Sequence, residues 1–298
     1  MKKKFAIQFI FLLLFAQQLM AQSNDSSYQN EIEQWHNKRV KNLKSESGWL
    51  TVAGLYWLKE GINSAGSGKD NDIRFPKGKA DEKVGVFELK NGEVTMRILP
   101  GVDVKCKDSA FHTGLIFKEG IEEQSIILSH KNLRWFIIKR GPKYGVRMRD
   151  LESDARKNFT QLERFPVDEK WRFRAVYEAP QAATTIPIHD VIGLTTETPY
   201  GGTVVFEKKK KKYRLDATLE DEDLFIVFAD ETSGISTYGG GRFLYAKKPS
   251  LGNELILDFN KAYNPPCAFT DFATCPLPPD QNKLAIEITA GEKKYGKH

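Results

Sequence analysis

Hydrophobic and polar residues first follow a helical period and then alternate in short runs. From Tyr28 to Leu43, apolar and aromatic residues recur at helical spacing, and Gly48 marks the end of the predicted helix. Ser26 and Gln29 fit a capping box at its start. Because the helix has a single apolar stripe, we expect it to lie across a sheet or between two domains.

Short strands follow this helix. The Asn91-Gly92 dipeptide stands between two alternating runs, which strongly predicts a hairpin. Several short strands at this spacing indicate a β-sandwich or a barrel. In the first half of the chain, the expected strands are 49–58, 84–89, 93–99, 115–117, 126–128, 133–139 and 145–148.

A charged segment at 150–166 interrupts the strands, and we place a domain boundary there. Beyond it no long amphipathic pattern occurs, and the expected strands are 171–177, 185–196, 203–206, 213–219, 224–228, 242–246, 254–260 and 284–288. Because closure removes exposed edges, a closed or half-closed antiparallel barrel is the preferred architecture. Lys208 to Lys212 lies between two of these strands and is interpreted as a solvated hairpin tip, with contact to an anionic surface as the alternative.

The predicted fold is therefore mostly β. An N-terminal helix precedes an antiparallel β-sandwich, which is followed by an antiparallel β-barrel-like domain. The expected divisions are a signal peptide at 1–21, the helix at 22–48, the sandwich at 49–150, and the barrel-like domain with a proline-rich cysteine loop at 151–298.

The first residues have the order of a secretory signal peptide. Three lysines at 2–4 precede an apolar run at 5–16, and a small residue, Ala21, stands at the expected cleavage point. The run is shorter than the roughly 20 residues that span a bilayer. We therefore predict an exported, periplasmic protein that does not span the membrane. Cleavage removes three lysines from a formal net charge of +6, and the mild balance that remains gives no reason to expect nucleic-acid binding.

The chain has three cysteines, Cys106, Cys267 and Cys275. Export favours oxidation, and two of them lie close together in the proline-rich loop, so we predict a Cys267–Cys275 disulfide. Cys106 is then expected as a small buried apolar residue. The odd number leaves a free thiol at any of the three as an alternative.

The segment from Ala65 to Ile73 resembles the start of a forkhead-associated domain, where a Gly-Arg-Ser element is followed by Asn-Asp-Ile. Such domains are β-sandwiches that bind phosphothreonine through loop residues. Here Ser67 occupies the place of the arginine, which is the side chain suited to bidentate phosphate binding. The resemblance implies a sandwich and not phosphopeptide recognition.

Several strings in the second half resemble the family known as domain of unknown function 1684, which implies an uncharacterised exported bacterial protein. The strings lie at 224–232, 237–242, 257–267, 275–279 and 290–292, with Asn282 between the last two.

Polar residues near the ends of predicted strands form a candidate ligand site. Asp258 and Asn260 share one strand face, and glycines at 239–241 precede Arg242, for which Asp230 or Asp258 is a plausible partner. The proline-rich loop with its disulfide would hold these side chains in place. The candidate residues are Asp230, Tyr238, Arg242, Asp258, Asn260, Tyr263 and Asn264. The alternative is that they form a structural network that ties loops to the barrel.

Two functions remain open from the sequence. The first is a periplasmic module that binds a small polar ligand or a partner protein. The second is a hydrolase of small or cell-envelope substrates, in which Asp230 or Asp258 acts as general base and Arg242 stabilises an anion. A purely structural envelope protein is a third alternative. Metal, nucleotide and nucleophile-elbow motifs are missing, and His112 and His189 are interpreted as structural, so no metal or cofactor is predicted.

Overall fold

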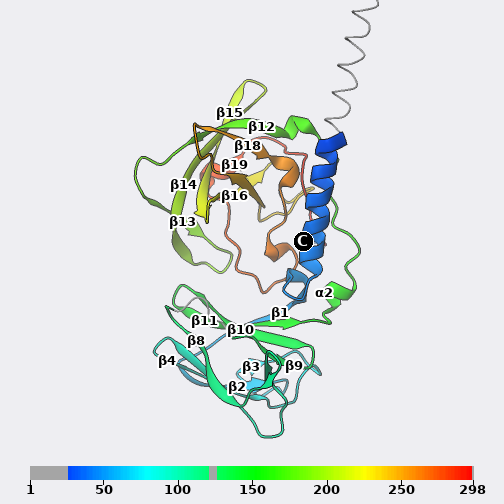
Figure 1. The fold of residues 1–298 in the computed structure, drawn as a ribbon, viewed down its shortest axis with the longest axis vertical. Helices are drawn as coiled ribbons and strands as arrows, with labels where there is room; N and C mark the ends of the chain where they lie inside the picture. The colour runs from blue at the N-terminus through cyan, green and yellow to red at the C-terminus, as the bar shows by residue number, and fades with distance from the viewer. Residues whose placement is uncertain (1–25, 121–125, 297–298) are drawn as a thin grey trace, which may run out of the picture.

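The computed structural model describes residues 26–120 and 126–296, so the predicted signal peptide lies outside the described residues. Residues 26–44 are helical, as the sequence pattern predicts. This N-terminal helix runs alongside the second β-structured half, which lies above the first in Figure 1. Its buried stripe includes Ile32 and Leu43. Among the described residues, no helix has the length and apolar character needed to cross a membrane.

The first half is an antiparallel β-sandwich, apart from one short parallel pair. Its larger sheet has the order β1 (Val52–Trp57), β11 (Lys143–Asp150), β10 (Leu133–Arg140), β9 (Leu128–His130), β6 (Lys105–Cys106) and β7 (Ser109–Ala110). The smaller sheet has the order β3 (Ile73–Arg74), β2 (Gly61–Gly66), β4 (Gly85–Lys90), β5 (Glu93–Ile98) and β8 (Thr113–Lys118). Phe75, Phe87 and Trp135 are buried in the core between the sheets.

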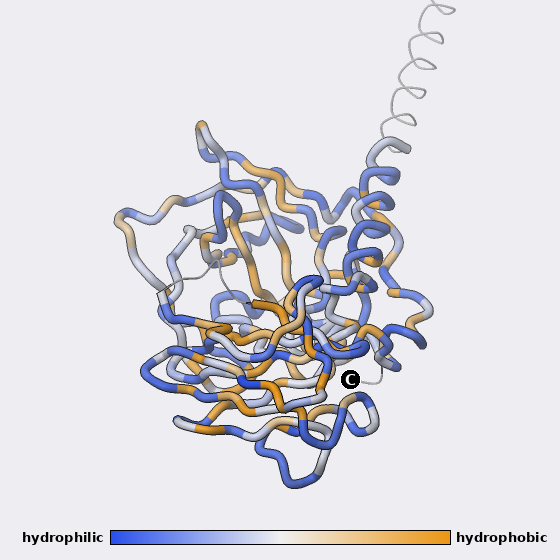
Figure 2. Tube along the Cα trace, turned by 60° about the horizontal axis from the view of Figure 1, so that its bottom comes forward, coloured by the Kyte–Doolittle hydropathy of each residue, from blue (hydrophilic) through white to orange (hydrophobic). Residues whose placement is uncertain are grey.

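The Asn91-Gly92 hairpin is confirmed. The two residues join β4 to β5, with Lys90 opposite Glu93. Their φ angles of 52° and 77° are both positive, as a two-residue turn of type I′ requires. Figure 2 shows hydrophobic and hydrophilic positions alternating along strands of this half, which is the pattern that places one face of each strand in the core.

The second half is a single strongly curved sheet. Its order is β17 (Arg242–Lys247), β16 (Asp223–Asp230), β15 (Lys211–Glu220), β14 (Thr195–Lys208), β12 (Arg172–Glu178) and β18 (Glu254–Asp258). Phe243 on β17 exchanges two backbone hydrogen bonds of 2.9 Å with Tyr263, which follows β18, so the sheet is nearly closed. The mostly β, barrel-like prediction is therefore confirmed.

Short elements complete this half. β13 (Thr185–His189) pairs with the first part of β14, and β19 (Lys283–Leu284) pairs in parallel with β16. The short helical turns of the chain are η1 (Trp49–Thr51), α2 (Asp154–Lys157), η3 (Glu169–Trp171), η4 (Phe259–Lys261), η5 (Pro266–Ala268) and η6 (Asp280–Asn282). The turn between β14 and β15 is formed by Lys209 and Lys210, which confirms that the lysine run is a hairpin tip.

The predicted strand 185–196 is wrong, because a tight turn divides it into β13 and β14. Asp190 Oδ1 accepts hydrogen bonds from the backbone N–H groups of Ile192 and Leu194, at 3.0 and 2.8 Å. An aspartate that bonds the backbone two residues later stabilises a turn, and Gly193 next to it has a φ of 79°. Apolar and β-branched residues on both sides of Asp190 and Gly193 hid this turn in the sequence.

Two further predicted strands are shorter than expected. β18 ends at Asp258 because its side chain accepts a hydrogen bond from the Asn260 N–H and caps η4. At 284–288 only Leu284 belongs to a strand. The two-residue strands β3, β6 and β7 and the strand β2 were not expected. The domain boundary at 150–166 stays a prediction.

Candidate functional site

Asp230 and Arg242 form a buried ion pair. Arg242 on β17 donates to Asp230 Oδ2 at 2.6 Å, and both side chains have 0% exposure. The same guanidinium donates to the carbonyl oxygens of Ala290 and Ile288, while Asp230 Oδ1 accepts from the Thr232 N–H at 2.7 Å. Burial lowers the pKa of Arg242, and the Asp230 charge opposes that shift. Of the two expected partners of Arg242, the structure selects Asp230.

Asp258 and Asn260 bind the N-terminal helix. The Tyr28 hydroxyl donates to both oxygens of Asp258 at 2.8 Å, and Asn260 Nδ2 donates to the Tyr28 oxygen at 3.0 Å. Asn260 Nδ2 also contacts the Asp168 carbonyl oxygen at 2.9 Å. Burial and the neighbouring Asp258 raise the pKa of Tyr28, so the hydroxyl keeps its proton.

Tyr263 and Asn264 contact Arg39 of the same helix. Arg39 pairs with Glu292 at 3.1 Å, donates to the Asn264 carbonyl oxygen at 2.8 Å, and lies 4.6 Å from the centre of the Tyr263 ring. Asn264 N–H donates to Glu292 Oε2 at 2.7 Å. Burial raises the pKa of Glu292, and Arg39 opposes the shift.

The remaining predicted feature, Tyr238 with the glycines after it, also has a packing role. Tyr238 packs against the small apolar cluster that includes Phe159. Gly241 has a φ of 87°, and a Cβ there would lie 2.6 Å from both the Phe228 carbonyl oxygen and Pro278. The predicted close backbone approach is therefore present, and it brings the proline-rich segment onto the barrel.

A concave site lies beside these networks, on the outer face of β15 and β16. β13 and residues 195–199 of β14 form an arm that extends from the barrel sheet (Figure 1). The segment 275–277 joins the arm, since Leu277 N–H donates to the His189 carbonyl oxygen at 2.8 Å and Val191 N–H donates to the Cys275 carbonyl oxygen at 3.0 Å. Between the arm, this segment and the sheet is a cavity of about 150 Å³, which we call the arm pocket.

The arm pocket has apolar walls and an acidic floor. Its apolar lining residues are Ile186 and Ile188 of the arm, Phe225 and Val227 of β16, and Pro276 and Pro279. Its polar lining includes Asp216, Thr218 and Glu220, which alternate along the outward face of β15. Asp216 Oδ1 accepts from the hydroxyls of Thr203 at 2.8 Å and Tyr200 at 3.2 Å. Both hydrogen bonds use the same carboxylate oxygen, Oδ1.

Asn282 opens the floor of the pocket by separating two strands. β15 and β16 pair at Thr218 opposite Phe225 and then diverge. There the Asn282 side chain accepts from the Asp216 N–H at 2.7 Å and donates at 2.8 Å to the carbonyl oxygens of Asp216 and Val227. The Asn282 amide replaces the backbone hydrogen bonds that are missing between β15 and β16. These backbone groups of Asp216 and Val227 therefore have partners although the two strands have separated.

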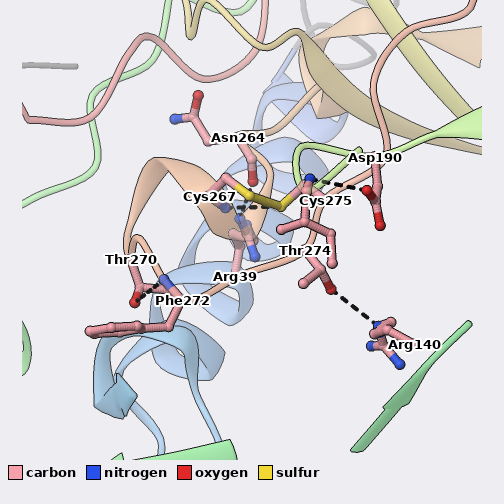
Figure 3. Close-up of a disulfide and its surroundings, with 10 residues drawn as sticks. Arg39, Arg140, Asp190, Asn264, Cys267, Thr270, Phe272, Thr274 and Cys275 are labelled. Carbon is pink, nitrogen blue, oxygen red and sulfur yellow. Dashed lines mark hydrogen bonds between the residues drawn. A yellow bond between two sulfur atoms is a disulfide. The ribbon is translucent and has the colours of Figure 1, made fainter. Parts of the chain in front are cut away.

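The predicted disulfide is present. Cys267 and Cys275 are bonded with Cα atoms 6.2 Å apart, and the loop that they close carries Thr270, Phe272 and Thr274 (Figure 3). The bond holds the start of the segment that covers the arm pocket. Cys106 is free and half-buried against the sandwich core.

Sequence reasoning missed the arm pocket although some signals existed. Asp216 and Thr218 alternate with Leu215 and Ala217, which is the pattern of a strand with a polar outer face. The wrong single strand at 185–196 concealed the arm that covers that face. Among the described residues, no three His, Cys, Asp or Glu side chains are grouped so as to hold a metal ion.

Fold and pocket together define a two-part β protein with a covered pocket on the outside of a barrel-like sheet. Residues 157–293 match the model of the family described as "Protein of unknown function (DUF1684)", and the chain belongs to this family. The chain is similar to an uncharacterized protein from Haloarcula marismortui solved by NMR, with 31% identity over 48% of this chain and 81% of that one and a TM-score of 0.40.

Two FHA domains are also similar. One comes from a study of phosphothreonine-dependent FHA domain interactions, and the other is the FhaA FHA domain in complex with an intracellular domain. Each match has 12% sequence identity and a TM-score of 0.22 and covers 32% of this chain. The matches cover 92% of the first FHA chain and 97% of the second. At this score the likeness carries no argument about a site. A comparison with curated proteins found no match.

Proposed function

We propose that the protein is a binding module that takes up a small ligand in the arm pocket. The observation that carries this proposal is the cavity itself, with apolar side chains on two opposite walls and a half-buried carboxylate, Asp216, between them. Ligand pockets are typically concave and mainly apolar, with a few polar groups that fix orientation.

The chemistry of the lining defines the class of ligand. The charged side chains that line the pocket, Asp216 and Glu220, are both acids. Glu220 already accepts a hydrogen bond from the Tyr245 hydroxyl, so Asp216 is the better-placed acceptor. The ligand is therefore a small molecule with an apolar body and a hydrogen-bond donor, such as an amine or a hydroxyl group.

Export to the periplasm belongs to the same proposal. The pattern at 1–21 is that of a signal peptide, and the Cys267–Cys275 disulfide suits an oxidising compartment. The disulfide also holds the roof of the pocket in the free protein, which reduces the entropy that is lost when a ligand binds.

The hydrolase alternative has less support. It needs a carboxylate that is free to accept a proton from water, but Asp230 is bound to Arg242 and Asp258 is bound to Tyr28 and Asn260. A base must lie within hydrogen-bond reach of the proton that it takes, and both candidates are enclosed by protein.

The test uses the neutral fluorophore N-phenyl-1-naphthylamine, which has an apolar body and one N–H donor. We expect its fluorescence to rise on binding to the purified protein. Ile188→Trp fills the pocket from the arm side and should weaken binding at least about tenfold, which corresponds to roughly 1.4 kcal/mol. Asp216→Asn tests whether the Asp216 carboxylate is the hydrogen-bond acceptor for the N–H group of the dye.

The matched control is Leu251→Trp, which introduces the same side chain at a residue with 90% exposure outside the pocket. It should leave binding unchanged. Equal binding by the two tryptophan variants would show that the dye binds elsewhere and would end the proposal. Mass spectrometry of small molecules that co-purify with the wild-type protein and not with Ile188→Trp would identify the natural ligand.

A further inference from the structure

Four arginines share one face of the larger sheet of the sandwich. On β10 and β11, Phe136 is opposite Arg147 and Arg134 is opposite Arg149, and Arg140 continues the same face. The alternate residues Leu133, Trp135 and Ile137 are buried in the sandwich core, so the arginine face is the outer one. β1, β10 and β11 are the strands of the sandwich that lie nearest the barrel half (Figure 1).

The arginine face is defined as Arg134, Arg140, Arg147 and Arg149. In the described structure its hydrogen bonds go to neutral oxygens. Arg149 donates to the Gly48 carbonyl oxygen at 2.6 Å and the Thr51 hydroxyl at 3.0 Å. Arg140 donates to the Thr274 hydroxyl at 3.1 Å, a contact that Figure 3 shows beside the disulfide loop.

Arg147 is the most unusual member. It has only 3% exposure, and its Nε has no hydrogen-bond partner. Its guanidinium carbon lies 5.4 Å from the centre of the Trp49 ring. Burial, together with the charges of Arg140 and Arg149, lowers the pKa of Arg147 to about 10, and no carboxylate acts in the opposite direction. Buried charges in proteins are normally paired, so a counter-charge is missing here.

Trp49, which comes just before β1, and the disulfide loop of the barrel half cover the arginine face and limit the size of what can bind. Trp49 lies over Arg147, and the disulfide loop contacts Arg140 through Thr274. Thr270 of that loop also donates to the Val52 carbonyl oxygen of β1 at 3.3 Å. A nucleic acid or a membrane cannot reach a side chain with 3% exposure, whereas Arg140 of the same face is exposed to solvent.

We propose that the arginine face is a binding site for a small oxyanion, a phosphate, sulfate or carboxylate group, held between the sandwich and the barrel half by Arg147 and Arg140. Guanidinium groups donate two parallel hydrogen bonds to such groups, and a bound anion supplies the counter-charge that Arg147 lacks. This site is separate from the acidic arm pocket and does not depend on it.

The experiment measures binding of inorganic phosphate, sulfate and acetate to the purified protein by calorimetry, at constant ionic strength. We expect at least one anion to bind and to raise the melting temperature. Arg147→Met should weaken that binding at least about tenfold, because a bidentate partner is lost. Arg140→Met, at an exposed position, should weaken it as well, which tests the site without changing a buried residue. The comparison among the three anions distinguishes a phosphate-type from a carboxylate-type ligand.

Arg214→Met is the matched control. Arg214 is an exposed arginine that is paired with Glu178 on the barrel sheet, so its loss removes the same charge far from the arginine face. Its anion affinity should stay within about twofold of the wild type, because screened surface charges contribute little. Equal affinities for wild type, Arg147→Met and Arg140→Met, or no binding of any of the three anions, would overturn the proposal.

Discussion

Two buried arginines have opposite surroundings. Arg242 has 0% exposure and Arg147 has 3%. The guanidinium of Arg242 lies 2.6 Å from the Asp230 carboxylate, whereas the charges that lower the pKa of Arg147 belong to Arg140 and Arg149. The comparison teaches that burial alone does not define a structural role, because only the first charge is balanced by the chain itself.

The same difference separates whole regions. The acidic groups at the end of the barrel have partners within the chain: Asp258 with Tyr28, and Glu292 with Arg39. This supports the interpretation of the predicted site residues as a network that holds the helix and loops together. The arm pocket instead is an open cavity, and the arginine face contains a buried charge without a counter-charge. Both proposals therefore place ligands there.

The largest expected effect on stability comes from breaking the Arg242–Asp230 ion pair. Asp230→Ala leaves Arg242 charged and buried without its counter-charge, and the free energy of unfolding should fall by about 3–5 kcal/mol. Urea unfolding measures this change. Glu178→Ala, which removes one partner of an exposed pair with Arg214, should cost less than about 1 kcal/mol. Similar losses in the two variants would contradict the special role of the buried pair.

The hydroxyl of Tyr28 tests the second network at the barrel end. Tyr28→Phe removes the donor that contacts both Asp258 oxygens, so the free energy of unfolding should fall by about 1.5–3 kcal/mol. Hydrogen exchange should show reduced protection of the helix at 26–44. If exchange of this helix does not change, its attachment does not depend on the hydroxyl. Tyr213→Phe, on β15 close to the lysine hairpin tip, serves as the control.

The unmatched arginine should behave in the opposite way. Arg147→Met removes a buried charge that has no counter-charge and keeps a long side chain under Trp49, so stability should rise by roughly 1 kcal/mol in anion-free buffer. The same urea titration checks it. A loss as large as that of Asp230→Ala would mean that Arg147 has a protein partner of equal importance.

A pH titration gives the smallest signal. Burial raises the pKa of Glu292 above its ordinary 4.5, so the folded protein keeps a proton that the unfolded chain has already released. The contribution of this group to stability therefore decreases as the pH rises from 4.5 through the raised pKa. Glu292→Gln cannot ionise and should remove this decrease, which melting temperatures across that range would show. Parallel profiles for the two proteins would mean that Arg39 fully compensates for burial.

Local features of the sequence predicted much of the fold. The helix at 26–44, the Asn91-Gly92 hairpin and the lysine hairpin tip follow from residues that are adjacent in the chain. The disulfide also followed from two cysteines eight positions apart in one restrained loop. The prediction of one strand at 185–196 failed because the Asp190 side chain sets a turn inside a segment of mostly apolar and β-branched residues.

The sequence by itself determined the mostly β architecture, since alternation and turn residues act over a few positions. Only the tertiary structure decided that Arg242 pairs with Asp230 rather than Asp258, because the strand register of β16 and β17 sets that contact. The arm pocket and the arginine face were also decided there. The arm pocket combines elements more than fifty residues apart, and Trp49, which lies far from β11 in the sequence, covers the arginine face. Whether a charge is matched depends on what the fold places opposite it.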